Sequence, residues 1–170
     1  MVRARDRVAV AATTPVPARD RFTWHVEHDP ATRAELTRDA QSAMTLRFTL
    51  GAGRPANQFA ALVGAVADGV ARYDRVVFSG RADRPMRIDV ELRPRGTDNP
   101  PRWQRSVYLD ESPRTMTIPF ADLRPLPRDV TAPLPLDAVD ALMFVVDTNN
   151  TPPGTSGVVT IGRVAWGALH

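Results

Sequence analysis

The sequence contains no cysteine and no lysine, and only 6% of its residues are aromatic. Without cysteine the chain cannot form a disulfide, a thiolate zinc site or an iron–sulfur cluster, and it has no cysteine nucleophile. All 22 of its basic residues are arginines, and it has 16 prolines. This composition is typical of a gene with a high G+C content, so the arginines alone do not indicate a function.

Long apolar runs are also missing, and none approaches the ~20 residues of a membrane-spanning helix. The net charge is only +3, with 19 acidic residues among the 22 basic ones. A nucleic-acid-binding protein concentrates its basic residues in a patch or stripe, whereas residues 87–93 mix arginines with acidic residues. We therefore expect neither a nucleic-acid partner nor a transmembrane segment.

The chain is long enough for one ordinary domain. A domain of 170 residues buries roughly 70% of the surface that its unfolded chain exposes, so it needs no disulfide or structural metal to fold. Residues 1–21 contain Pro15 and Pro17 without an apolar period, which favours an extended linker or a disordered tail. Because no linker divides the remainder, we predict a single domain over residues 22–170.

Short apolar segments separated by turn residues indicate an all-β protein. Ile88, Val90 and Leu92 alternate with charged residues, as in a strand with one buried side. Residues 141–146 are continuously apolar, which indicates a central strand covered on both sides. We expect strands at residues 22–27, 45–50, 59–66, 73–80, 86–93, 103–109, 115–120, 141–147 and 158–166.

Two segments also allow a helix. Alanine enrichment within residues 59–72 suits a helix as well as a strand. Asp29 and Pro30 can open one helical turn within residues 31–40. Since the other segments all favour strands, the predicted fold is a two-sheet antiparallel β-sandwich.

The chemical motifs of common enzymes are absent from the sequence. His25 and His28 lie three residues apart, so on a strand they point to opposite sides and are poorly placed to share a metal ion. Glycoside hydrolysis needs two carboxylates that flank a bound sugar, but acidic pairs such as Asp110 and Glu111 sit beside turns, where carboxylates usually bond to the backbone. We therefore predict a protein that is not an enzyme and carries no cofactor or metal.

Polar side chains of two neighbouring segments form the candidate ligand site. Sugar sites combine an aromatic face with planar polar groups that bind hydroxyls. If Val107 and Leu109 are buried, Tyr108 faces solvent, while Trp103 belongs to the core or its rim. With the polar residues that alternate with the buried ones, the candidate ligand-binding residues are Arg87, Asp89, Glu91, Gln104, Ser106, Tyr108 and Asn149.

Asn149 comes from the polar loop that follows the most apolar segment. Two interpretations of this loop stay open. It is either a structural turn held together by Asp147 and Asn149, or a loop that contacts a ligand.

Four segments, in order, carry a resemblance to a known family: FSGRADRPMRIDVELR at residues 78–93, RWQRSVYLD at 102–110, RTMTIPFADLRP at 114–125 and ALMFVVDTNNTPPGTSGVVTIGRVAWG at 141–167. They resemble the carbohydrate-binding-like β-sandwiches related to the complex I intermediate-associated protein family, and the resemblance extends from residue 22 to residue 167. It implies a galactose-binding-like jelly roll. It also implies a non-catalytic domain appended to a larger bacterial protein, with an extracytoplasmic or periplasmic location.

Many sandwiches of this kind hold a structural calcium ion through a carboxylate near the C-terminus. Gly162 and Arg163 stand where the resemblance leads us to expect an acidic pair, so oxygen ligands would have to come from Glu27, Asp29 or the backbone. The expected partner is a glycan or polysaccharide. The alternative is a protein-interaction or assembly domain of the same fold, because an aromatic shelf in a groove favours sugar and a flat patch ringed by arginines favours protein.

Overall fold

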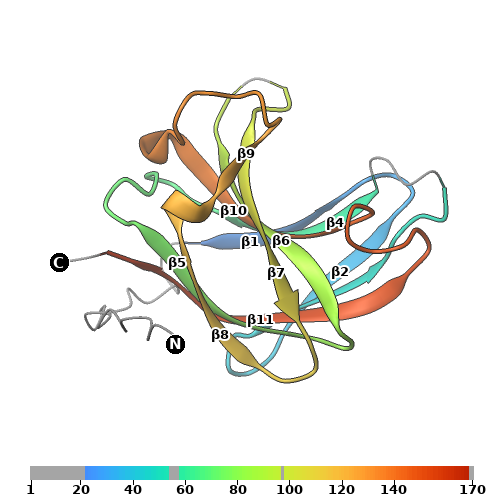
Figure 1. The fold of residues 1–170 in the computed structure, drawn as a ribbon. Coiled ribbons are helices and arrows are strands. Elements are labelled where there is room, and N and C mark those ends of the chain that lie inside the picture. Colours follow the sequence, from blue (N-terminus) through green and yellow to red (C-terminus); the bar gives the residue numbers. More distant parts are fainter. Residues whose placement is uncertain (1–21, 54–57, 97, 169–170) are drawn as a thin grey trace, which may run out of the picture.

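The computed structural model describes residues 22–53, 58–96 and 98–168, so the predicted linker or tail at residues 1–21 lies outside the described part. The described residues form two antiparallel sheets that pack face to face (Figure 1). This architecture confirms the predicted all-β jelly-roll sandwich.

The strands are long enough to give two broad sheets. From edge to edge, the six-stranded sheet contains β1 (Thr23–His28), β4 (Phe59–Ala65), β10 (Val139–Asp147), β6 (Met86–Pro94), β7 (Arg102–Leu109) and β9 (Arg124–Leu126). The five-stranded sheet contains β2 (Arg33–Arg38), β3 (Met44–Thr49), β11 (Ser156–Gly167), β5 (Arg75–Ala82) and β8 (Arg114–Pro119). Single 3₁₀ turns occur at η2 (Phe120–Asp122) and η3 (Leu136–Ala138). Within the described residues, no helix has the length and hydropathy to cross a membrane.

The main core lies between the sheets, on the side of β6 that carries Ile88, Val90 and Leu92. Each of the three is at most 1% exposed, which confirms the predicted buried side of this strand. Phe144 of the neighbouring β10 belongs to the same core, whereas the preceding Met143 is buried on the opposite side of the sheet. The strand β10 is therefore covered on both sides, as its continuous apolar run predicted.

An aromatic cluster within this core is centred on Trp166 of β11. The indole is 2% exposed, and its centroid lies 5.3 Å from that of Phe22, 5.9 Å from Phe120 and 6.1 Å from Tyr73. Ring pairs at such spacings contribute beyond the area they bury. Because the three partners come from distant parts of the chain, this one side chain links the beginning, middle and end of the domain.

All nine predicted strands are present, and their ends differ from the prediction by no more than two residues. The helix that residues 59–72 also allowed does not form. Instead β4 pairs with β1 on one side and β10 on the other. Its alanines at positions 60 and 61 are fully buried between these neighbours.

The helical turn suggested within residues 31–40 is wrong, because the edge strand β2 occupies that segment. The carboxylate of Asp29 does not cap a helix. Its Oδ2 accepts a hydrogen bond from the backbone N–H of Ala31 at 2.9 Å, and its Oδ1 accepts one from that of Phe59 at 2.8 Å. Asp29 thus turns the chain locally and ties the turn to the start of β4.

The strand β9 was not predicted either, because its three residues lie in a proline-rich segment. Pro125 is compatible with β9 since β9 is an edge strand. The pairing of β9 with β7 ends at Gln104. Residues 105–109 of β7 therefore form an open edge in the described structure.

Candidate ligand-binding face

The side of the six-stranded sheet that faces away from the main core is called the outer face here. Along β6 and β7, the register pairs Asp89 with Ser106 and Glu91 with Gln104, so the side chains of each pair are direct neighbours. The two strands bring six of the seven predicted ligand-binding residues onto this face: Arg87, Asp89, Glu91, Gln104, Ser106 and Tyr108.

Tyr108 supplies the aromatic surface of the outer face. It is 41% exposed. The guanidinium of Arg114 lies 5.6 Å from its ring centroid, within reach of a cation–π interaction, and also pairs with Asp110. The tyrosine ring is therefore supported by a fixed neighbour while much of its surface stays open.

Arg87 is held beside Tyr108 by the neighbouring strand. Its Nε donates to the hydroxyl of Ser106 at 3.0 Å, and its Nη2 donates to the carbonyl oxygen of the same residue at 3.3 Å. The guanidinium remains exposed. It can present further N–H groups to a ligand in a fixed orientation.

Asp89 and Glu91 lie on the outer face, but they are buried, whereas the sequence predicted them to face solvent. Asp89 is 3% and Glu91 2% exposed. The prediction was wrong because β6 is an inner strand and polar partners cover both carboxylates. Asn150 donates to Asp89 Oδ2 at 3.1 Å, and Arg102 donates to Glu91 Oε2 at 3.4 Å.

This burial changes the acidity of both groups. It raises the pKa of Asp89 to about 6, with a further contribution from the charge of Asp147. It raises the pKa of Glu91 to about 7, against the opposing effect of Arg102. The cause is the loss of hydration of the charged form. Strongly perturbed carboxylates of this kind concentrate at functional sites.

An ion pair spans the other half of the outer face. Arg93 of β6 donates to both carboxylate oxygens of Glu27 of β1, at 2.8 and 3.1 Å, and β10 and β4 lie between these two strands. We call this pair the arginine strap. It crosses a second apolar cluster, every member of which is at most 2% exposed: Ala61, Val63, Ala141, Met143 and Val145. The half of the face over β4 and β10 is therefore closed. The half over β6 and β7, where Arg87 and Tyr108 are exposed, is called the open half.

The seventh predicted residue, Asn149, lies in the loop between β10 and β11. Its Nδ2 donates to Asp147 Oδ2 at 2.9 Å, and its backbone N–H donates to Asp147 Oδ1 at 3.0 Å. Asp147 and Asn149 therefore form the structural turn that was one of the two interpretations of this loop. The following residue, Asn150, reaches the outer face through its bond to Asp89. Sequence reasoning missed Asn150 because the local pattern does not tell which of two successive amides points toward the sheet.

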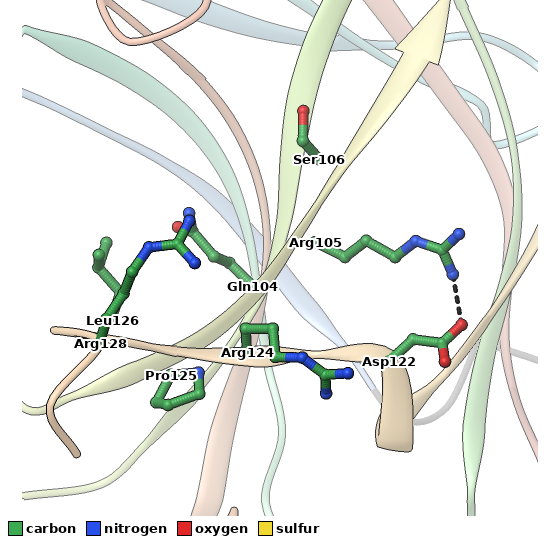
Figure 2. Close-up of a pocket in the computed structure, with 8 residues that line it drawn as sticks. All are labelled: Gln104, Arg105, Ser106, Asp122, Arg124, Pro125, Leu126 and Arg128. Atoms are coloured by element: carbon green, nitrogen blue, oxygen red, sulfur yellow. Dashed lines mark hydrogen bonds and ion pairs between the residues drawn. The ribbon is translucent and has the colours of Figure 1, made fainter.

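A pocket of about 230 Å³ adjoins the outer face where β9 ends along the edge of β7 (Figure 2). Gln104 and Ser106 form part of its wall, and Arg124 and Arg128 form another part. Figure 2 shows Arg105 reaching to Asp122, with Nη1 and Oδ2 2.5 Å apart. This extension was not predicted, because residues 124–128 contain two prolines and show no strand pattern in the sequence.

The carboxylates named above as substitute calcium ligands are already used by the protein. Both oxygens of Glu27 accept bonds from Arg93, and both oxygens of Asp29 accept backbone N–H groups. We therefore expect the melting temperature to be the same in calcium and in a chelator, as measured by differential scanning fluorimetry. Since a bound ion stabilises the folded state by mass action, a rise of several degrees in calcium would contradict this prediction.

No protein-family model matches the chain, and no curated protein matches its sequence. Solved structures do resemble it. The family 11 carbohydrate-binding module of a cellulosomal cellulase of Clostridium thermocellum has a TM-score of 0.63 and 15% identity, over 95% of this chain and 98% of that module. The family 11 module of Clostridium thermocellum in complex with a β-1,3-1,4-mixed-linked tetrasaccharide has a TM-score of 0.63 and 16% identity, over 88% and 96%.

A carbohydrate-binding module of family 29 is also similar, with a TM-score of 0.51 and 14% identity over 86% of this chain and 89% of that one. At these identities the likeness establishes the fold. The chain has the jelly-roll β-sandwich of carbohydrate-binding modules, and it spans almost the whole length of the family 11 module.

Proposed function

We propose that this chain is a non-catalytic glycan-binding module and that its site is the open half of the outer face, over β6 and β7. The observation that carries the proposal is the placement of the exposed Tyr108 ring beside Arg87, on the same face as the polar residues Asp89, Ser106, Glu91 and Gln104. An aromatic ring stacks on the C–H groups of a sugar, and planar charged groups bind its hydroxyls in pairs. The tetrasaccharide named for the family 11 neighbour supports the same class of ligand.

Each predicted residue has a separate role in this proposal. Tyr108 stacks on one sugar ring, and Arg87 donates to its hydroxyl oxygens. Asp89 and Glu91 lie beneath the ligand and hold Asn150 and Arg102 in place, with Gln104 and Ser106 completing the polar edge. Asn149 stays at the rim, where it holds the loop that positions Asn150 over Asp89.

The geometry of the carboxylates favours binding over hydrolysis. A glycoside hydrolase places its two carboxylates on either side of the scissile bond. Asp89 and Glu91 are alternate residues of one strand, so both approach a sugar from the same side. Each is also engaged by a neighbouring side chain, and neither is free to act on the opposite side of a bound ring.

The wider setting belongs to the proposal as well. Residues 22–170 would form the binding domain and residues 1–21 its tether to a larger bacterial, extracytoplasmic protein. We also propose that the chain is related to the complex I intermediate-associated protein family. This proposal rests on the sequence segments described above. The alternative, an assembly domain that uses the outer face for a protein partner, predicts that no glycan binds.

Glycan-array screening of the purified chain, followed by calorimetry with a β-1,3-1,4-mixed-linked tetrasaccharide, tests the proposal. In the variant Tyr108→Ala we expect binding to weaken by roughly 1–3 kcal/mol, the range for a central aromatic contact. The melting temperature should change little, because the ring is largely outside the core.

Ile88→Ala is the matched control, because Ile88 is the residue after Arg87 on the same strand but faces the main core. It should cost roughly 2–5 kcal/mol of folding free energy and leave the affinity of the folded protein unchanged. The assignment of faces is wrong if Tyr108→Ala unfolds the domain and Ile88→Ala does not. If the parent chain binds no glycan at all, the protein-interaction alternative replaces the proposal.

A further inference from the structure

The pocket beside β7 carries an excess of positive charge. Three guanidinium groups, from Arg105, Arg124 and Arg128, line it against the single carboxylate of Asp122. That carboxylate is already paired with Arg105. Two positive charges in this pocket therefore have no opposite charge among its lining residues.

The two remaining arginines are available to a ligand. Arg124 uses only Nη1, which donates to the carbonyl oxygens of Ala121 and Leu123. Arg128 is exposed and makes no hydrogen bond or ion pair within the part of the chain that the structure describes. A guanidinium whose planar N–H groups are unpaired matches a carboxylate, which accepts two parallel hydrogen bonds.

The position of the pocket connects these charges to the proposed glycan site. Gln104 and Ser106 belong both to the outer face and to the pocket wall. A glycan lying over Tyr108 and Ser106 can therefore extend over Gln104 and place one residue near Arg128, whose guanidinium lies beside the Gln104 side chain, whereas Arg124 points toward Asp122 (Figure 2). The pocket, at about 230 Å³, is smaller than the ~300–1,000 Å³ of sites for drug-sized ligands, which suits one sugar unit rather than a long chain.

We infer that this pocket is a subsite for an acidic sugar, and that the ligand of the module is a glycan containing uronic acid whose carboxylate binds Arg128, with Arg124 as a second positive charge of the same pocket. The inference rests on the proposed glycan-binding function and narrows its ligand class. Leu126, 40% exposed at the same pocket, provides an apolar wall for the C–H side of the ring. The closed half of the face under the arginine strap does not take part.

The test compares ligands that differ only in charge. Calorimetry of the full chain is carried out with a trimer of galacturonate, with the neutral methyl ester of the same trimer and with the neutral mixed-linked tetrasaccharide. The acidic trimer should bind at least about tenfold more tightly than its ester, because a charge-assisted bidentate contact is lost in the ester. Equal or tighter binding of the ester would overturn the inference.

The variants Arg124→Gln and Arg128→Gln identify the residues. Arg128→Gln should reduce the affinity for the acidic trimer about tenfold or more, and Arg124→Gln should reduce it less. Both should leave the affinity for the neutral tetrasaccharide unchanged. Arg81→Gln removes the same charge from an exposed arginine of β5 in the other sheet and should leave both affinities unchanged. An equal loss in Arg81→Gln would show that only the overall charge matters, which also overturns the inference.

Two further outcomes separate the subsite from the general proposal. If the neutral tetrasaccharide binds through Tyr108 and the acidic trimer binds no better, the module is a glycan binder without an acidic subsite. If no carbohydrate binds, the general proposal fails together with the subsite. A sulfated trimer that binds more tightly than the galacturonate trimer would overturn the assignment of a carboxylate.

Discussion

Replacing Trp166 by alanine should lower the free energy of unfolding by roughly 3–5 kcal/mol, the range for removing a buried aromatic side chain. The indole is 2% exposed and contacts three other aromatic rings. Its loss leaves a cavity that these rings, fixed on separate parts of the chain, cannot easily fill. The measurement is chemical denaturation, with the stability extrapolated to water.

Two variants control for this result. Trp166→Phe keeps an aromatic ring in the cluster and should lose less stability than the alanine variant. Tyr108→Ala removes an aromatic ring that is 41% exposed and should cost no more than about 0.5 kcal/mol. A loss of under about 1 kcal/mol for Trp166→Ala would contradict the central place of this side chain in the core.

The second large effect concerns the buried carboxylates of the outer face. At about pH 7.5, Asp89→Asn and Glu91→Gln should each be more stable than the parent chain by about 1–3 kcal/mol. The raised pKa of each group corresponds to roughly 3 kcal/mol of unfavourable charging in the folded state. Part of this gain is lost, because the new amide N–H groups must find acceptors in a buried site.

The sign of the pH dependence follows from the direction of the shifts. The pKa values of Asp89 and Glu91 are about 6 and about 7, above the ordinary values of 3.8 and 4.5. Between about pH 4 and pH 7 the folded chain therefore holds protons that the unfolded chain has released. The contribution of these groups to stability is fully present below about pH 4 and is lost as the pH rises to about 6 for Asp89 and about 7 for Glu91.

Denaturation of the parent and both variants at about pH 4 and about pH 7.5 measures this difference. The advantage of the variants should disappear at the lower pH, where the parent carboxyls are also neutral. An advantage of the same size at both values would show that burial does not raise these pKa values. Because the ionised carboxylates hold Asn150 and Arg102 at the proposed site, each variant should also bind the proposed glycan more weakly while it folds more stably.

The strand pattern was predictable where one side of a strand is buried. Ile88, Val90 and Leu92 alternate strictly with charged residues, and that period alone placed them in the core. The edge strands β2 and β9 were missed for a physical reason. An edge strand is short and partly solvated, so its sequence need not be apolar. Before β2, the sequence Asp29-Pro30 is compatible both with a helix cap and with a turn that is bonded to β4.

The sequence predicted which residues lie on the outer face, but it did not predict their burial or their hydrogen-bond partners. The period of two put Asp89 and Glu91 on the outer face. Their burial depends on Asn150 and Arg102, which reach them from other elements. The arginine strap is equally non-local, because Arg93 and Glu27 are 66 residues apart in the chain and no local pattern pairs them.

The arginine strap also bears on how this domain can diverge in evolution. A surface sheet side usually accepts many substitutions. Here, however, Ala61 is the register neighbour of Glu27 and Ala141 that of Arg93, and both are at most 1% exposed, so a larger residue at either position would displace one partner of the ion pair. Homologous domains should therefore keep small residues at these two positions wherever they keep the ion pair. New specificities should arise through changes at exposed positions of β7 and β9, such as Tyr108 and Arg124, which carry no such packing constraint.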